Sequence, residues 1–338
     1  MKSRILLLLI FTLALLIPVF TFSQSSRQMI NFDKGWKFAF GHAADPAKDF
    51  NFGIANIFAK TGKADGTPMS LKFDDSNWRS LDVPHDWAVE LPFVNSANFD
   101  VMAHGYKPVG GLFPETSIGW YRKSFTISTA DSGKRFALRF DGVFRDAIFW
   151  LNGFYLGNNK SGYLGATYDI TDYVQYGKPN VITVRVDATQ YEGWFYEGAG
   201  IYRHVWLMEY ESLHLDDGSL FVYSKLSNGK ASVVCDGAIV NESLQPLTAT
   251  VRTTIAGRDG VVLASSKETK VTVAAGSRES VMQNIQLKNP RLWSLYDPYL
   301  YKVITEVECN GKLIDRIMIR HGIRTIRMDA DKGLLLNG

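Results

Sequence analysis

Aromatic and acidic side chains are interleaved in one short stretch of this 338-residue chain. Residues Tyr191–Glu197 read Tyr-Glu-Gly-Trp-Phe-Tyr-Glu, so Trp194 lies between the carboxylates of Glu192 and Glu197. An indole face packs against the C–H groups of a pyranose ring, and a carboxylate accepts hydrogen bonds from its hydroxyls. This mix of side chains suits contact with a pyranose, and aromatic packing at a domain edge is the alternative.

Two further segments carry groups that suit the rim of a sugar site. In the Pro-His-Asp-Trp segment that starts at Pro84, the side chains of His85 and Asp86 can hydrogen-bond each other and stiffen a loop. Packing around the turn explains this segment as well. His104 and Tyr106 lie in a glycine-rich stretch, which suits a loop over a sugar pocket and equally suits a long surface connection.

The other histidines and carboxylates show no spacing typical of metal binding or catalysis. His204, His214 and His321 are single histidines without a second ligand at metal spacing, so we expect no metal ion or other cofactor here. No pair of carboxylates has a recognisable catalytic spacing. We therefore predict no catalytic residue within this chain.

Three arginines and two cysteines are expected to have structural roles. A planar guanidinium among apolar neighbours can bridge strands or hold a buried carboxylate, and this describes Arg122, Arg145 and Arg203. Cys235 and Cys309 lie in strands of the later part of the chain. We favour two free thiols, and a disulfide between them is the alternative.

The composition is that of a folded, nearly neutral protein. Hydrophobic residues make up 46% of the chain and charged residues 21%, which excludes disorder, and two cysteines cannot build a disulfide scaffold. The formal net charge is +3, of which Lys2 and Arg4 supply two charges. The charge that remains gives no reason to expect nucleic acid, so we predict a neutral partner.

Residues 1–23 have the pattern of a secretory signal peptide. A basic start is followed by an apolar run from Ile5 to Phe22 and by a small residue, Ser23, at the expected cleavage point. We expect an exported protein, periplasmic or extracellular, with no membrane contact after cleavage. A retained membrane anchor is the alternative, because the run is near the length that spans a bilayer.

Alternation of apolar and polar residues dominates the rest of the chain. Phe136, Leu138 and Phe140 alternate with small or polar residues, as in half-buried strands of an antiparallel sheet. Asn-Gly pairs at Asn152 and Asn310 separate such runs, and Asn-Gly tolerates the positive φ of tight hairpin turns. Long amphipathic patterns are missing, so we predict an all-β fold.

The spacing of the strands predicts two β-sandwich domains. Residues 24–209 are rich in Trp, Gly and long connections, which favours a double-sheet jelly roll. Residues 210–329 hold about seven short strands at regular spacing, typical of an immunoglobulin-like sandwich. Residues 330–338 end in Leu-Leu-Leu-Asn-Gly, which we interpret as a truncated lead-in to a further domain.

Several motifs follow one another in a fixed order along the chain. They are Trp78–Trp87, Gly119–Phe125, Phe140–Val143, Trp150–Gly153, Thr167–Val174, Asn180–Asp187, Gly198–Leu207, Leu292–Tyr301 and Arg320–Arg327. In this order they resemble the amino-terminal half of a glycoside hydrolase family 2 enzyme, most of all the family's β-galactosidases. The resemblance covers nearly all of residues 30–338.

The resemblance implies a galactose-binding-like jelly roll, an immunoglobulin-like sandwich, and a catalytic (β/α)8 barrel that is absent from this chain. In the family, two glutamates on the barrel act as nucleophile and acid/base, and no position here matches their motifs. In the family the acid/base glutamate follows an asparagine, and Asn241-Glu242 has the same order. We expect this pair to lie at the end of a sandwich strand and not to be catalytic. We expect the chain to be inactive alone, and a divalent cation to belong only to the barrel.

The resemblance also implies a function and a set of residues that line the site. Loops of the jelly roll would reach the terminal sugar, and the candidates are Glu192, Trp194, Glu197, His104, Tyr106, His85 and Asp86. The implied protein is an exported enzyme that hydrolyses terminal β-galactosides, with carbohydrate as its partner. Its oligomeric state stays open, and a homo-oligomer is the candidate form of the full-length protein. The alternatives are β-glucuronide or β-mannoside specificity, or a stand-alone, non-catalytic carbohydrate-binding or scaffold module.

Overall fold

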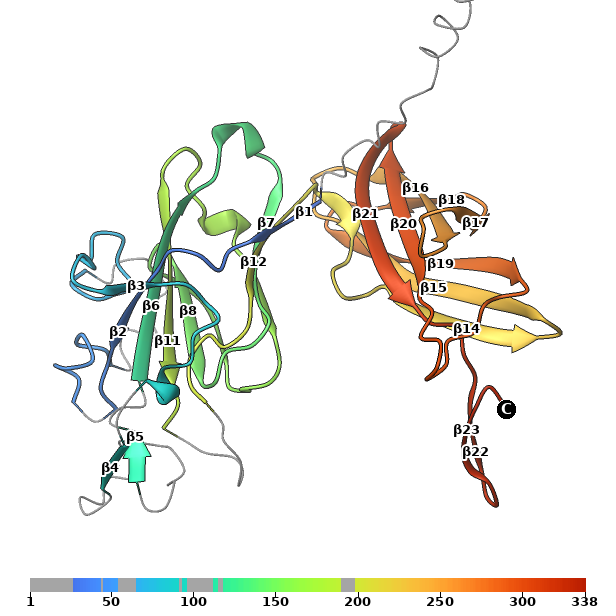
Figure 1. Cartoon of the computed structure of the whole chain (residues 1–338). Helices are drawn as coiled ribbons and strands as arrows, with labels where there is room; N and C mark the ends of the chain where they lie inside the picture. Colours follow the sequence, from blue (N-terminus) through green and yellow to red (C-terminus); the bar gives the residue numbers. More distant parts are fainter. Residues whose placement is uncertain are drawn as a thin grey trace, which may run out of the picture.

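The computed structural model describes residues 27–43, 45–53, 65–90, 93–95, 112–114, 118–189 and 198–338. These residues form two β-sandwiches side by side, the first blue to yellow-green and the second yellow to red in Figure 1. Helix in the described residues is limited to three 3-10 turns, which are η2 (Trp87–Val89), η3 (Thr129–Asp131) and η4 (Thr171–Tyr173). The prediction of an all-β fold is confirmed.

The first sandwich packs a four-stranded sheet against a six-stranded sheet. The four-stranded sheet has the order β1 (Gln28–Asn31), β12 (Val205–Tyr210), β7 (Arg135–Phe140) and β10 (Ala166–Asp169). The six-stranded sheet has the order β3 (Arg79–Leu81), β2 (Trp36–Phe40), β6 (Ile118–Thr126), β11 (Pro179–Asp187), β8 (Ala147–Leu151) and β9 (Phe154–Asn159). A separate pair, β4 (Phe93–Asn95) and β5 (Leu112–Pro114), lies at one end of this sandwich (Figure 1).

The alternating residues predicted for β7 do form the core between these sheets. Phe136, Leu138 and Phe140 are buried, and they pack in one cluster with Trp36 and Phe149. Burial of large aromatic and aliphatic side chains in this way is the main force that holds two sheets face to face.

The second sandwich also consists of two antiparallel sheets. In the first sheet, β15 (Lys230–Asn241) pairs with β13 (Leu213–Leu215), β14 (Phe221–Ser227) and β19 (Ser277–Lys288). In the second sheet, β17 (Val262–Ser265), β16 (Leu247–Ala256), β20 (Tyr301–Cys309) and β21 (Lys312–His321) follow one another, and β18 (Thr269–Val273) also pairs with β16. The arrangement is an immunoglobulin-like sandwich.

The two Asn-Gly pairs occupy tight turns, as predicted. Asn152 and Gly153 have φ of 53° and 85° between β8 and β9, and Asn310 and Gly311 have φ of 51° and 76° between β20 and β21. Positive φ at both central positions matches the right-handed twist of the paired strands.

The two cysteines are free thiols, which confirms the favoured alternative. Cys235 lies in β15 and Cys309 in β20, and these strands belong to opposite sheets. The Cys235 thiol is buried 3.3 Å from the hydroxyl of Thr305, and burial raises its pKa.

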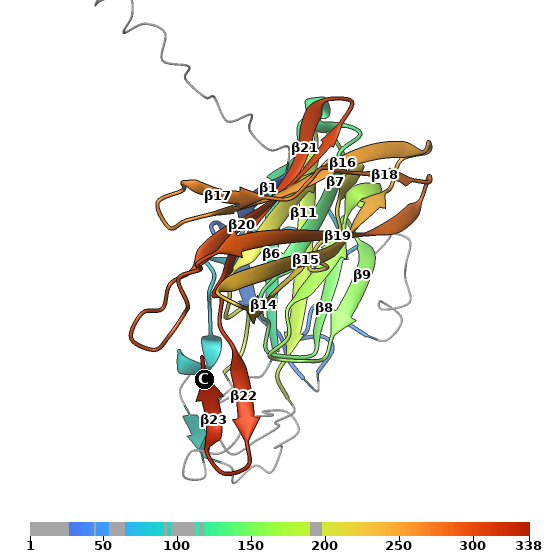
Figure 2. The ribbon, with the colours of Figure 1, turned by 90° about the vertical axis from the view of Figure 1, so that its right-hand side faces the viewer.

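The apolar run near residue 334 is a strand of a small hairpin. β23 (Gly333–Leu336) pairs with β22 (Ile326–Asp329), and Asn337 continues the contact by donating its N–H to the carbonyl of Thr325 at 2.9 Å. Figures 1 and 2 show this hairpin extending away from the second sandwich, in the direction in which β4 and β5 lie on the first.

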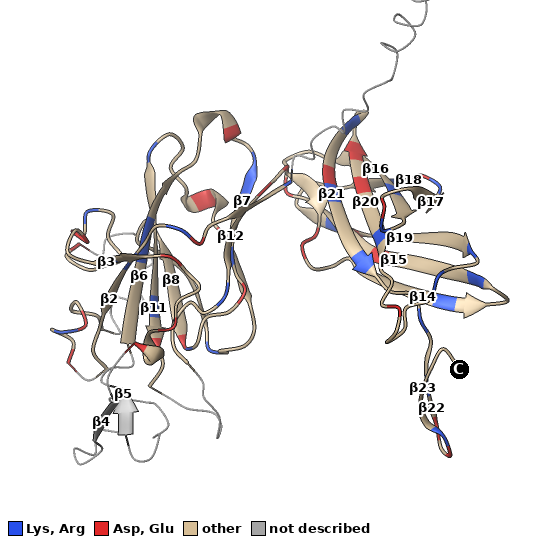
Figure 3. Cartoon of the chain, in the orientation of Figure 1, with Lys and Arg blue, Asp and Glu red and all other residues tan. Residues whose placement is uncertain are grey.

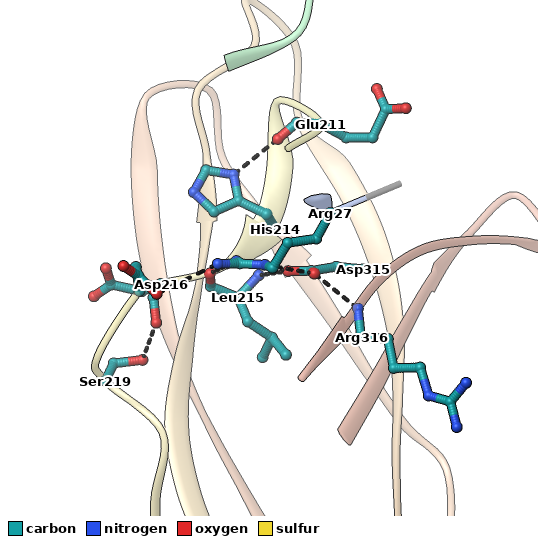
Figure 4. Close-up of polar contacts among 9 residues, drawn as sticks. Arg27, Glu211, His214, Leu215, Asp216, Ser219, Asp315 and Arg316 are labelled. Atoms are coloured by element: carbon teal, nitrogen blue, oxygen red, sulfur yellow. Dashed lines mark hydrogen bonds and ion pairs between the residues drawn. The ribbon is translucent and has the colours of Figure 1, made fainter. Parts of the chain in front are cut away.

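Apolar and charged groups together join the two sandwiches. The outer face of β7 and β12 presents a small buried cluster of Ala137, Met208 and Tyr210. The guanidinium of Arg27 lies 5.1 Å from the Tyr210 ring and binds the buried carboxylate of Asp315 on β21 (Figure 4). The first sandwich is therefore tied to the second by a buried ion pair as well as by the chain connection.

Charged positions of both signs are mixed over the strands of both sandwiches (Figure 3). Among the residues placed by the structure, no helix is long and apolar enough to cross a membrane.

Candidate functional site

The segment from Pro84 to Trp87 is held against a second segment that begins at Gly198. The N–H of His85 donates to the carbonyl of Ile201 at 2.7 Å, and the N–H of Trp87 donates to that of Ala199 at 3.1 Å. Gly198 directly follows the predicted sugar-lining stretch in sequence. The structure therefore places His85 and Asp86 beside the segment that begins at Gly198.

The His85 side chain is buried and has polar partners at both ring nitrogens. Nδ1 lies 2.7 Å from the Tyr121 hydroxyl, and Nε2 lies 3.1 Å from Glu90 Oε1 and 2.9 Å from Arg79 Nη2. Burial lowers the pKa of His85, and Arg79 acts in the same direction, while the Glu90 carboxylate opposes them. The imidazole is consequently neutral at neutral pH and orders the loop that carries it.

Asp86 holds two backbone N–H groups through one carboxylate oxygen. Its Oδ1 accepts hydrogen bonds from the N–H of Ala88 at 3.0 Å and from the N–H of Ala199 at 2.8 Å. The first bond caps η2, and the second holds the segment after Gly198. Asp86 as a residue is half-buried.

Gly200 permits the close contact between these two segments. Its φ is +114°, and a Cβ at this position would lie 2.4 Å from the Tyr121 hydroxyl and 2.6 Å from the carbonyl oxygen of His85. Only glycine fits this space and this backbone conformation without strain. The sequence contributed Gly198–Leu207 only as part of the family resemblance, and the structural role of Gly200 was not predicted.

The other side of the predicted stretch is anchored by a buried ion pair. Arg185 on β11 binds Asp49 at 2.8 Å and Asp187 at 3.2 Å, and Asp187 accepts from the hydroxyl of Thr189 at 2.6 Å. Burial raises the pKa of Asp49, although Arg185 and the Trp120 indole oppose this effect. Described residues thus hold the chain firmly on both sides of the predicted stretch.

Two of the seven predicted site residues, His85 and Asp86, can be placed. The other five lie outside the described residues, and they are Glu192, Trp194, Glu197, His104 and Tyr106. That all seven line a sugar site stays a prediction. The placed groups provide a neutral imidazole, a half-buried carboxylate and a braced loop, which suits hydrogen bonding to an uncharged ligand.

The Asn241-Glu242 pair lies in a structural contact between the sandwiches. The buried amide of Asn241 donates to the carbonyls of Gln245 and Val273, at 2.8 Å and 3.0 Å. Glu242 forms an ion pair with Arg135 of the first sandwich at 2.9 Å. These contacts give both side chains a structural role.

The three arginines differ in their surroundings. Arg122 is buried and binds Asp75 at 2.8 Å, which confirms its structural role, and Arg145 is half-buried beside Asp146 at 3.2 Å. For Arg203 the expectation is wrong. Its side chain is exposed and makes a 3.4 Å hydrogen bond to the carbonyl of Asp141. Within the described ranges, no group of three His, Cys, Asp or Glu side chains is placed to hold a metal ion.

Both sandwiches match models of one enzyme family. Residues 54–211 match "Glycosyl hydrolases family 2, sugar binding domain", and residues 213–324 match "Glycosyl hydrolases family 2".

Curated relatives carry two different enzyme names. The chain is 37% identical over 268 residues to β-galactosidase BoGH2A of Bacteroides ovatus, which covers 79% of this chain and 30% of the relative. It is 31% identical over 317 residues to a putative β-glucuronidase of Formosa agariphila, covering 94% of this chain and 27% of that protein. The chain thus spans about a third or less of the length of these two relatives.

Solved structures agree with the sequence matches. A glycosyl hydrolase family 2 member from Bacteroides cellulosilyticus superposes with a TM-score of 0.74 at 31% identity, covering 93% of this chain and 38% of that one. A family 2 β-glucuronidase superposes with a TM-score of 0.77 at 25% identity, covering 94% of this chain and 32% of that one.

Proposed function

This chain belongs to the family 2 glycosyl hydrolases, and we propose that it supplies the sugar-contacting rim and scaffold of an exported enzyme that hydrolyses terminal β-galactosides. The observation that carries the proposal is the match to the family's sugar-binding domain. The matched residues include His85 and Asp86 and the segment from Gly198 to Ile201 that they contact, which we call the rim. Carbohydrate is accordingly its partner.

The choice of a β-galactoside is supported by the relative at 37% identity and by the charge of the rim. Among the residues that the structure describes, Arg79 is a cation in contact with His85, and its guanidinium is paired with Glu90 at 2.6 Å. A sugar that carries a carboxylate needs a cation of its own, whereas a neutral sugar needs only hydrogen-bonding groups. β-Glucuronide specificity is the second candidate, because other relatives carry that name. β-Mannoside specificity has less support.

Chemistry at the glycosidic bond is proposed to come from a domain outside the described residues. Retaining hydrolysis needs two carboxyl groups about 5–5.5 Å apart, and inverting hydrolysis needs about 6.5–9.5 Å. The described acidic groups of the rim, Asp86 and Glu90, are engaged by backbone N–H groups and by Arg79. We propose that the 338-residue chain binds and positions substrate but does not cleave it.

Export is proposed from the first 23 residues. Mass spectrometry of the secreted protein should find a new amino terminus near Gln24, with the Lys2 and Arg4 charges removed. If the protein is found in a membrane fraction with residues 1–23 still attached, it is membrane-anchored, and the proposal of cleavage and export is wrong.

The proposed activity is tested by assaying the full-length gene product on a panel of nitrophenyl glycosides. We expect the fastest release from the β-galactoside and none from the 338-residue chain alone. Faster release of nitrophenol from the β-glucuronide than from the β-galactoside would make β-glucuronide specificity the first candidate. A gene that encodes no catalytic domain after residue 338 would favour the stand-alone binding module.

A further inference from the structure

A polar groove with a volume of about 830 Å³ lies between the two sandwiches. One wall is the outer side of β7 and β10 together with the residues just before β12, and the other is the turn after β13. The residues that matter here are Arg139, Asp141, Thr167, Arg203, His204 and Asp217. We propose that this groove binds a neutral saccharide, whose hydroxyl groups hydrogen-bond to its arginine and aspartate side chains.

Two guanidinium groups supply hydrogen-bond donors to the groove. Arg139 is 44% exposed and uses Nε to bind Asp141 Oδ1 at 3.0 Å. Arg203 is exposed and makes a 3.4 Å bond to the carbonyl of Asp141. An arginine has five N–H donors, so each side chain retains donors for a ligand.

Carboxylates and a hydroxyl supply the acceptors. Asp141 and Asp217 are 24% and 32% exposed, and Thr167 lies directly opposite Arg139 across the β10–β7 pair. A carboxylate has about four acceptor positions, and the contacts of Asp141 and Asp217 leave some of them open. Each sugar hydroxyl both donates and accepts, so a ligand of this kind needs donors and acceptors side by side.

The charges of the groove compensate one another. Asp141 is paired with Arg139 at 3.0 Å, and Asp217 is paired with Arg27 at 3.4 Å. Since both carboxylates face a guanidinium, the groove presents no field of a single sign. At Arg139 an anion would have to displace the paired Asp141 carboxylate, whereas a polyhydroxyl ligand can use the donors that both groove arginines retain.

Acidic groups on both walls already have protein partners before any ligand arrives. Asp141 Oδ2 accepts from the Trp206 indole N–H at 2.8 Å, and the Asp141 N–H donates to the carbonyl of His204 at 3.0 Å. The His204 ring is oriented by Asp33 through a 2.7 Å contact at Nδ1. On the opposite wall, Asp217 is held by Arg27. Rigid groups lose little entropy on binding, so modest contacts suffice for recognition.

The size and openness of the groove limit its affinity. Its volume lies within the range of about 300–1,000 Å³ that small-molecule sites occupy. Tight sites bury about 70–90% of their ligand, whereas a groove covers only one side of a sugar ring. We therefore expect dissociation constants in the range of about 1–10 mM.

The test is a titration of the purified chain with lactose, followed by two-dimensional nitrogen–proton NMR. The Trp206 indole N–H is the reporter, because it bonds to a carboxylate of the groove, and a Trp206→Phe variant identifies its signal. The buried indole N–H of Trp36, bonded to the Phe32 carbonyl, is the internal control. Lactose should shift the Trp206 signal with a millimolar midpoint and leave the Trp36 signal in place.

Matched variants assign the effect to the groove. Arg203→Gln and Arg139→Gln should each weaken lactose binding about fivefold to tenfold, the usual effect of losing a hydrogen bond. Arg258→Gln is the control, since Arg258 is an exposed arginine with a 3.4 Å bond to a backbone carbonyl in the second sandwich. Unchanged binding by both groove variants would overturn the proposal.

The anion arm of the experiment uses glucuronic acid and sodium sulfate. If these shift the Trp206 signal at lower concentrations than lactose does, the neutral ligand class is wrong. The inference does not rest on the proposed glycosidase activity, because binding is measured on the chain itself. If the full-length product has no activity on β-galactosides, the proposed function is wrong, but the proposal of a lactose-binding groove is unaffected.

Discussion

Arg27 and Asp315 form a buried bidentate ion pair across the boundary between the two sandwiches. Arg27 Nε and Nη2 lie 2.8 Å and 2.9 Å from the two carboxylate oxygens, and the side chains are 8% and 0% exposed. Arg27 also donates to the carbonyl of Leu215, and Asp315 accepts from the N–H of the same residue at 2.7 Å (Figure 4). The orientation of the first sandwich relative to the second is thus fixed by an almost fully buried ion pair.

Replacing Arg27 by alanine should strongly destabilise the chain. The substitution leaves the Asp315 carboxylate buried without its partner, which typically costs about 3–5 kcal/mol. Urea unfolding should show a loss of this size, and separate transitions for the two sandwiches in place of one.

Arg278→Ala is the matched control for this variant. Arg278 binds Asp216 at 2.7 Å, but the two side chains are 56% and 33% exposed. Exposed pairs contribute about 0–1 kcal/mol, so this variant should unfold nearly like the original chain. Equal effects of the two substitutions would show that the Arg27 contact does not couple the sandwiches.

Acid should destabilise the folded chain from about pH 6.5 downward. Burial lowers the pKa of His85, His214 and His321 below the ordinary value of 6.5. The unfolded chain therefore binds more protons below pH 6.5 than the folded chain does. The stability is fully present above this pH and is lost as the pH falls toward the folded pKa values.

The measurement is urea unfolding at pH 7.5 and pH 5.5. Each histidine contributes at most about 1.4 kcal/mol per pH unit in this window. His85→Gln should reduce the difference, because one buried proton-binding group is gone. An unfolding free energy that stays constant or rises on acidification would contradict the assignment of buried, neutral imidazoles.

Gly200→Ala should disrupt the brace between the two rim segments. The new Cβ would lie within 2.6 Å of the His85 carbonyl oxygen and the Tyr121 hydroxyl, at a φ of +114°. Strain and overpacking together should cost about 2–5 kcal/mol. Gly260→Ala separates the two effects, since Gly260 has φ +89° and no heavy atom within 4 Å of an added Cβ.

The expected result for Gly260→Ala is a loss of about 1–2 kcal/mol from backbone strain alone. If Gly200→Ala costs no more than this control does, the neighbouring groups of Tyr121 and His85 have moved to accommodate the new Cβ, and the close contact is not rigid. Thermal and urea unfolding measured on both variants provide the comparison.

Local features of the sequence predicted most of the fold. The alternation through Phe136, Leu138 and Phe140 identified a core strand, because the side chains of a strand point alternately to its two faces. The turns at Asn152 and Asn310 were found because few residues other than glycine tolerate positive φ. In each case the constraint acts within a few residues of chain.

Long-range contacts at the rim and at the domain boundary could not be predicted from the sequence. Arg27 and Asp315 are 288 residues apart, and nothing near either residue signals a buried pair. His85 meets Tyr121 across 36 residues, so its neutral state follows only from the assembled rim. Arg203 was expected among apolar partners and is exposed, because apolar neighbours in sequence did not become neighbours in space.

Asp86 allows a test of whether the rim contacts sugar through its charge. Both backbone N–H groups bond to Oδ1, so Asp86→Asn keeps an acceptor at that position and removes only the negative charge. Asp86→Ala removes the acceptor as well, which should cost about 1–2 kcal/mol of stability.

In the full-length enzyme we expect Asp86→Asn to melt like the original protein and to raise KM about fivefold to tenfold with little change in kcat. The reason is that a hydrogen bond to a charged acceptor contributes more than one to a neutral amide. Asp86→Ala should lose stability as well as affinity. If KM is unchanged in Asp86→Asn and rises only in Asp86→Ala, the carboxylate positions the loop after Gly198 and does not touch the sugar.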